Sequence, residues 1–182
     1  MIMRRVLALL AKVNETACDA AKNLAGLLLM AMLLIVVMQI VFRYVLNDSL
    51  AWSEELAKAM MVWTAFLVAP WAYRIGANVR IELFIDEMPL VFRNSLTLLL
   101  NALVFWIVAV FFWESVGFWQ RGLTVQADSL PFQVAWFYSI VPITFAFMIL
   151  VGAELLLRNI LTLLNPDEVF DLSHLNDAYQ IE

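Results

Sequence analysis

Long runs of residues without a charged side chain dominate the pattern of this chain. Four such runs occur, at residues 23–42, 59–73, 94–113 and 129–153. Three of them are long enough to cross a bilayer as a helix, which takes about 20 residues. The second reaches that length if its helix begins near Ala51. Because backbone hydrogen bonds must be satisfied within the chain in lipid, the pattern predicts an all-α integral membrane protein with four transmembrane helices.

The predicted organisation is a four-helix membrane domain over residues 1–164 and an acidic tail over residues 165–182. The four predicted spans cover residues 23–43, 51–73, 94–119 and 132–157. The last helix should end near Asn165, because a proline disfavours the helical conformation in the residue before it. The tail holds five acidic residues and no Lys or Arg, so we expect it to be solvated.

The segment before the first span carries Arg4 and Arg5, followed by only six apolar residues before Lys12. That apolar stretch is shorter than the one a secretory signal usually contains. We therefore expect an interfacial N-terminal helix segment that leads into the first span.

Lys and Arg residues are unevenly divided between the two sides that four spans create. Eight fall on the side of the termini and three on the other. Since positive residues accumulate on the cytoplasmic side, both termini are predicted to be cytoplasmic. The loop over residues 74–93 then lies in the cytoplasm. Its alternating apolar and polar residues fit an extended segment, and its apolar residues equally fit a short helix on the membrane surface.

Composition narrows the classes of function. The chain is 64% hydrophobic and 15% charged, whereas soluble domains are about half apolar and about a quarter charged. The single cysteine and the single histidine, His174 in the tail, cannot build a usual zinc site, and no span offers a histidine to haem iron. There is no basic surface for nucleic acid and no glycine-rich phosphate loop. We expect neither an enzyme nor a bound cofactor.

Charged residues are also missing from the deep parts of the first, third and fourth spans, which argues against a transport path within this chain. Glu114 and Glu154 lie near the ends of the third and fourth spans. We expect them to be hydrated at the interface, or paired with Arg121 and Arg158 respectively. The alternative is that they handle an ion.

Motifs concentrate between residues 42 and 89. The chain reads Phe42-Arg43-Tyr44-Val45-Leu46-Asn47, then Trp52-Ser53-Glu54-Glu55, Tyr73-Arg74-Ile75-Gly76 and Val79-Arg80-Ile81-Glu82. In this order and spacing the motifs resemble the DctQ-type small membrane subunit of tripartite ATP-independent periplasmic (TRAP) transporters. Three residues depart from the family pattern: Ala51, Asn78 and Glu82 stand where proline, histidine and aspartate are common.

The resemblance implies a helper subunit in the bacterial inner membrane. It would pack against a large membrane subunit of the DctM type, which carries the substrate and sodium sites, while a periplasmic binding protein delivers the solute. Transport would be driven by an ion gradient, with sodium bound by the partner and no cofactor in this chain. The alternative is a self-contained small transporter or a structural tetraspan protein.

Four candidate contact residues lie on the outer side, one at the end of the first span and three at the start of the second. Trp52 is expected to anchor the second span at the interface. Glu54 and Glu55 would either stabilise the start of that helix through its dipole or contact a partner. Arg43 would either extend to the lipid head groups or form an ion pair with Glu54 or Glu55.

The other candidate residues lie on the inner side. Arg74 and Arg80 are expected to enforce the orientation and to contact anionic lipid. Asp86 does not suit lipid contact, so it is expected to pair with Arg80 or with the partner subunit.

Overall fold

The computed structural model describes residues 2–48, 50–85, 90–129 and 131–164. Its helices are α1 (Ile2–Tyr44), α2 (Ala51–Ile85), α3 (Leu90–Gly122), α4 (Ala135–Tyr138) and α5 (Ile140–Leu164). Four of them, all but the short α4, contain stretches long and apolar enough to cross a membrane. The prediction of an all-α protein with four transmembrane helices is confirmed.

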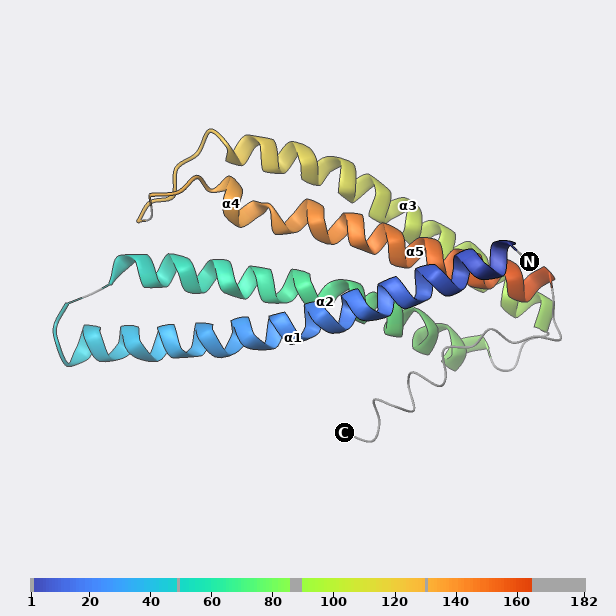
Figure 1. The fold of residues 1–182 in the computed structure, drawn as a ribbon, viewed down its shortest axis with the longest axis horizontal. Helices are drawn as coiled ribbons and strands as arrows, with labels where there is room; N and C mark the ends of the chain where they lie inside the picture. Colours follow the sequence, from blue (N-terminus) through green and yellow to red (C-terminus); the bar gives the residue numbers. More distant parts are fainter. Residues whose placement is uncertain (1, 49, 86–89, 130, 165–182) are drawn as a thin grey trace.

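At the end that holds the α1–α2 turn, the long helices lie side by side in the order α1, α2, α5, α3 (Figure 1). Towards the termini, α1 crosses α2 and also contacts α5. α1 packs along α2 and α3 packs along α5, and the two pairs meet where α5 contacts α2 and, to a smaller extent, α1. α1 and α3 therefore form the two edges of the arrangement. The start of α1 and the end of α5 lie at one end of the bundle, and the α1–α2 turn and the α3–α4 loop lie at the other (Figure 1).

Two helices are longer than the spans predicted for them. α1 has 43 residues without a break, which makes it about 65 Å long at 1.5 Å per residue. The predicted N-terminal segment is thus helical, but it continues directly into the first span instead of forming a separate element. α2 likewise continues to Ile85, so the extended alternative for the segment after Arg74 is wrong over the described residues.

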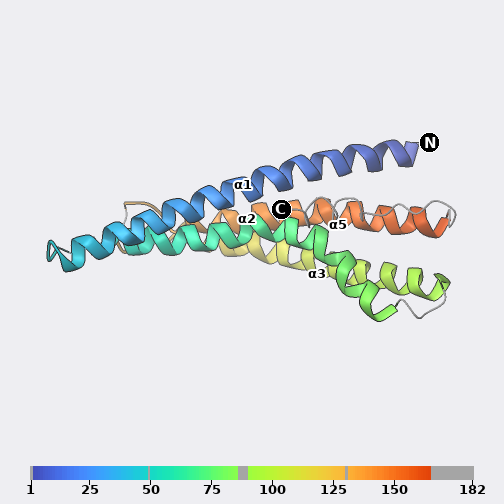
Figure 2. The same cartoon turned by 90° about the horizontal axis from the view of Figure 1, so that it is seen from below.

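α2 bends where it passes the middle of the bundle (Figure 2). Pro70 lies inside this helix and is fully buried. A proline removes one backbone hydrogen bond and its ring clashes with the preceding turn, which is a common cause of a kink. We therefore attribute the bend to Pro70.

The turn after α1 has a backbone cap. Asn47 has a φ of 56°, a left-handed conformation that asparagine tolerates better than most residues. The N–H of Asp48 donates to the carbonyl of Phe42 at 3.1 Å, which satisfies one of the free carbonyls at the helix end. The Asn47 turn therefore ends α1 before α2 begins at Ala51.

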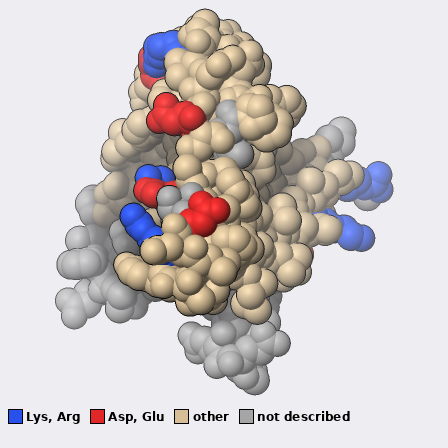
Figure 3. Space-filling view, turned by 90° about the vertical axis from the view of Figure 1, so that its left-hand side faces the viewer, with Lys and Arg blue, Asp and Glu red and all other residues tan. Residues whose placement is uncertain are grey.

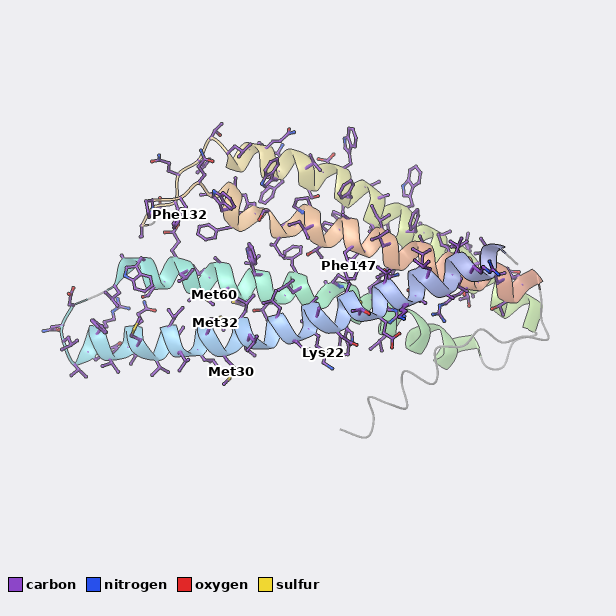
Figure 4. All side chains as sticks on the ribbon, viewed as in Figure 1. Lys22, Met30, Met32, Met60, Phe132 and Phe147 are labelled. Carbon is purple, nitrogen blue, oxygen red and sulfur yellow. The ribbon has the colours of Figure 1, made fainter. Side chains whose placement is uncertain are left out.

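The buried centre of the bundle lies in the half that contains the termini. Cys18 of α1 packs with Val151 and Leu155 of α5, and aromatic rings cover them. The rings come from Trp71, Tyr73 and Phe147. In the other half, α1 contacts mainly α2, and Met30 points away from the bundle whereas Met32 points towards α2 (Figure 4).

The orientation predicted from the basic residues can be tested by thiol labelling in a Cys18→Ser background. Val125 is exposed in the α3–α4 loop, and Thr16 is exposed on α1 in the half of the bundle that contains the termini. In intact spheroplasts, an impermeant maleimide should label Val125→Cys and leave Thr16→Cys unlabelled until the membrane is opened. The reverse pattern would place the termini outside the cytoplasm.

Candidate functional site at the two ends of the helix bundle

Glu55 ties the start of α2 to the α3–α4 loop. Its carboxylate accepts hydrogen bonds from the backbone N–H groups of Asp128, at 3.2 Å, and Ser129, at 2.9 Å. Hydrogen bonds to a charged acceptor are stronger than neutral ones. The contact joins the two hairpins at the end far from the termini, so Glu55 has a structural partner within the chain.

Glu54 has a different role. It pairs with Lys58 at 2.7 Å, one helical turn later, and both side chains are exposed. Exposed pairs at this spacing contribute little to stability, because solvent and salt screen the two charges. Figure 3 looks onto this end and shows charged side chains spread over a largely uncharged surface.

Arg43 forms no ion pair with Glu54 or Glu55 in the described part of the chain, so the pairing predicted as one option is not formed in the structure. The two glutamates instead engage Lys58 and the α3–α4 loop. Arg43 is exposed in the last turn of α1, where a cation also complements the helix dipole. Trp52 is partly exposed at 37%, and its role as an interface anchor stays a prediction.

A buried polar cluster lies in the half that contains the termini. At its centre is Glu154 of α5, which has 0% exposure. Its oxygen Oε1 accepts hydrogen bonds from Arg158 at 2.7 and 3.1 Å and from Arg74 of α2 at 3.2 Å. Its other oxygen, Oε2, accepts from the side-chain amide of Asn14 of α1 at 2.7 Å. We call Asn14, Arg74, Glu154 and Arg158 the Glu154 cluster.

The cluster connects three helices. Arg74 also donates to the carbonyl of Ala11 at 3.3 Å, and Asn14 also donates to the carbonyl of Leu150 at 3.3 Å. α1, α2 and α5 are therefore held together by side chains that bind one another and the neighbouring backbone. The guanidinium groups of Arg74 and Arg158 share the carboxylate of Glu154. Because an unpaired charge in an apolar environment is costly, both buried arginines need this carboxylate.

The Glu154 cluster corrects two predictions. Arg74 is only 5% exposed, so its expected contact with lipid is wrong: its side chain reaches both α1 and α5, and Glu154 of α5 supplies the opposite charge. The expected hydration of Glu154 is also wrong, whereas its pairing with Arg158 is confirmed. Asn14 was not predicted as a site residue. Its buried position four residues before buried Cys18 marks a packed helix face that runs on beyond the first span.

The structure gives fewer contacts for the remaining predicted residues, Glu114, Arg80 and Asp86. Glu114 is exposed, and it forms no ion pair with Arg121 within the described residues. Arg80 lies in α2, but its side chain is outside the described residues, and so is the whole of Asp86. Their predicted contacts with lipid, with each other or with a partner therefore stay predictions.

Polar groups between the two ends bond locally. Thr144 of α5 donates to the carbonyl of Phe66 of α2 at 3.3 Å, whereas Thr64 donates within its own helix to Met60 at 2.8 Å. Among the described residues there is no group of His, Cys, Asp and Glu able to hold a metal ion. The arrangement fixes helices to one another and offers no chain of titratable groups across the membrane over the part of the chain that is described.

These features define an integral membrane protein whose polar side chains serve helix assembly. Residues 32–162 match the DctQ component family of the tripartite ATP-independent periplasmic transporters. The chain belongs to this family, and is thus a transporter component and a multi-pass protein of the inner membrane. The matched part includes Glu55, Arg74, Glu154 and Arg158 and begins after Asn14.

Individual relatives agree with the family. The chain is 28% identical over 122 residues to the sialic acid TRAP transporter small permease protein SiaQ of Vibrio cholerae, covering 67% of this chain and 70% of SiaQ. It is 26% identical over 132 residues to the isethionate TRAP transporter permease protein DctMQ of Oleidesulfovibrio alaskensis, covering 68% of this chain. It is 34% identical over 88 residues to the sialic acid TRAP transporter permease protein SiaT of Haemophilus influenzae, covering 48% of this chain. The matches span only 20% of DctMQ and 14% of SiaT.

Proposed function

We propose that this chain is the small helper subunit of a TRAP transporter and packs against a large membrane subunit. A periplasmic binding protein delivers the solute to the large subunit, which takes it up. A sodium gradient drives this uptake. Support comes from the lengths of the related proteins. SiaQ is a separate small permease protein of similar extent, whereas in DctMQ and SiaT the matching part is a small portion of a longer permease chain. A small permease that occurs as a separate protein in one relative and as part of a longer permease in others is expected to associate with the remaining part of that permease.

The observation that carries this proposal is the distribution of polar groups. Residues 23–42, 59–73, 94–113 and 129–153 carry no charged side chain, and the Glu154 cluster is held by interhelical contacts. A transporter that works alone needs polar or charged groups inside the membrane along its substrate or ion path. A helper needs apolar faces and fixed helix ends, which are the features that the structure provides.

Reconstitution tests the proposal. Proteoliposomes containing this chain alone should show no uptake when an inward sodium gradient is imposed and binding protein loaded with solute is added. Adding the large subunit should restore uptake, and affinity purification of this chain from its native membrane should recover the large subunit. A potassium gradient of equal size serves as the control for the coupling ion.

Ion-driven uptake by this chain alone would overturn the helper role and favour a self-contained transporter. Uptake by the complete system that is equally fast with sodium and with potassium would remove sodium coupling from the proposal and leave the helper role in place.

A further inference from the structure

α3 has two opposite faces. Asn101, Val108 and Ser115 are buried, and their spacing of seven residues places them on one side of the helix. The opposite side exposes a row of large residues at alternating steps of four and three. The row consists of Leu99, Leu103, Trp106, Val110 and Trp113. We call this row, together with Glu114 and Gly117, the α3 face.

α1 forms the other edge of the bundle and exposes a similar row. It consists of Leu27, Met30, Leu34, Val37 and Val41, also at steps of three and four, and we call it the α1 face. Each member is apolar and carries no side-chain hydrogen-bond donor, which suits contact with lipid tails. Both edges are therefore open to a neighbour, but their chemistry differs.

Trp106 is poorly suited to lipid. It is 70% exposed and lies close to the middle of the candidate span Ser95–Gly122. Exposed tryptophans in membrane proteins gather at the interface, where the indole N–H meets water or head groups. Lipid tails offer no acceptor, and the described residues give the Trp106 N–H none. Trp63 shows the usual solution, because its indole N–H donates to the carbonyl of Phe137 at 3.0 Å.

Glu114 adds a charge to the same face. It is exposed one turn after Val110 and has no ion pair among the residues that the structure describes. It lies eight residues before the end of α3 at Gly122, or about 12 Å along the helix. Gly117 follows on the same side, and nothing lies within 4 Å of the position that its Cβ would occupy. Such an opening lets a neighbouring helix approach closely.

We infer that the α3 face is the docking surface for a transmembrane helix of the large subunit and that the α1 face is turned to lipid. The docked helix places a hydrogen-bond acceptor opposite Trp106 and a lysine or arginine opposite Glu114. It satisfies the donor and the charge that lipid would leave unpaired. This assignment rests on the proposed helper function, since that function supplies the large subunit as the partner.

Photo-crosslinking in the intact complex tests the assignment. A p-benzoylphenylalanine residue replaces Trp106 in one variant and Leu34, which is 69% exposed on the α1 face, in the matched control. After irradiation in the native membrane, the variant at position 106 should be crosslinked to the large subunit, and the variant at position 34 should not.

Three results would overturn the assignment. They are a crosslink to the large subunit from position 34, a crosslink from position 106 to a second copy of this chain, and no protein crosslink from position 106. Co-purification of the wild-type chain with the large subunit is measured in parallel. If the wild-type chain co-purifies with the large subunit but a crosslinking result contradicts the assignment, the docking face is wrong and the helper function stands. If co-purification fails, the helper function fails and the assignment fails with it.

A second variant isolates the hydrogen bond. Trp106→Phe keeps an aromatic ring and removes the N–H, and it should weaken association with the large subunit by roughly 3- to 20-fold, the range given by measured interhelical hydrogen bonds. Leu34→Phe on the α1 face is the control and should leave association unchanged. Equal association of both variants would remove the acceptor opposite Trp106 from the proposal.

Discussion

Replacing Glu154 with glutamine is expected to lower the melting temperature of the purified chain by about 6–20 °C. The substitution removes the only charge that compensates Arg74 and Arg158 within the Glu154 cluster. Breaking a buried ion pair by removing one partner costs about 3–5 kcal/mol, because the remaining charge stays buried. For a chain of this length, 1 kcal/mol corresponds to about 2–4 °C. Thermal unfolding in detergent can be followed by tryptophan fluorescence.

Glu15→Gln provides the matched control. It makes the same chemical change on α1, where Glu15 is exposed, and it should leave the melting temperature within about 1 °C, as is usual for surface substitutions. Combining Glu154→Gln with Arg74→Met should cost less than the sum of the two separate losses, because residues in contact are not additive. Additive losses, or a Glu154→Gln melting temperature equal to that of Glu15→Gln, would show that the cluster does not hold the bundle together.

The membrane-spanning fold could be predicted because its signal is local. A run of about 20 uncharged residues identifies a span without any knowledge of its neighbours. The lengths of α1 and α2 could not be obtained in the same way. Charged residues end an apolar run, but they do not end a helix, since Lys, Arg and Glu are good helix formers. α1 therefore begins well before its first uncharged run, and α2 continues past Arg74.

The contacts of the charged residues likewise fall into local ones, which the sequence predicts, and long-range ones, which it does not. The pairs Glu54–Lys58 and Glu154–Arg158 lie four residues apart on one helix, a spacing that brings side chains together on any helix. The contact of Glu154 with Asn14 spans 140 residues, and that of Glu55 with Ser129 spans 74. Such contacts depend on which helices are neighbours. The count of basic residues predicted the side of the membrane on which Arg74 lies, but it gave no sign that Arg74 is buried within the bundle.

Replacing Gly152 with leucine is expected to separate α5 from its neighbours. A Cβ atom at Gly152 would lie 2.8 Å from the ring of Phe105 on α3 and 3.3 Å from the hydroxyl of Tyr73 on α2. Small residues at helix interfaces in membranes let the backbones approach closely. Overpacking a well-filled interior typically costs about 1–3 kcal/mol, so the melting temperature of the purified chain should fall by about 2–12 °C.

Gly26→Leu on α1 is the matched control, because nothing lies within 4 Å of the position that its Cβ would occupy. Leucine is a better helix former than glycine, so this variant should be as stable as the wild type or more so. The two variants should also differ in assembly. α3 carries the proposed docking face and packs on α5, so displacement by Gly152→Leu should reduce co-purification with the large subunit, while Gly26→Leu should not. Equal melting temperatures for the two leucine variants would show that α5 and α3 do not pack as closely as the structure has them.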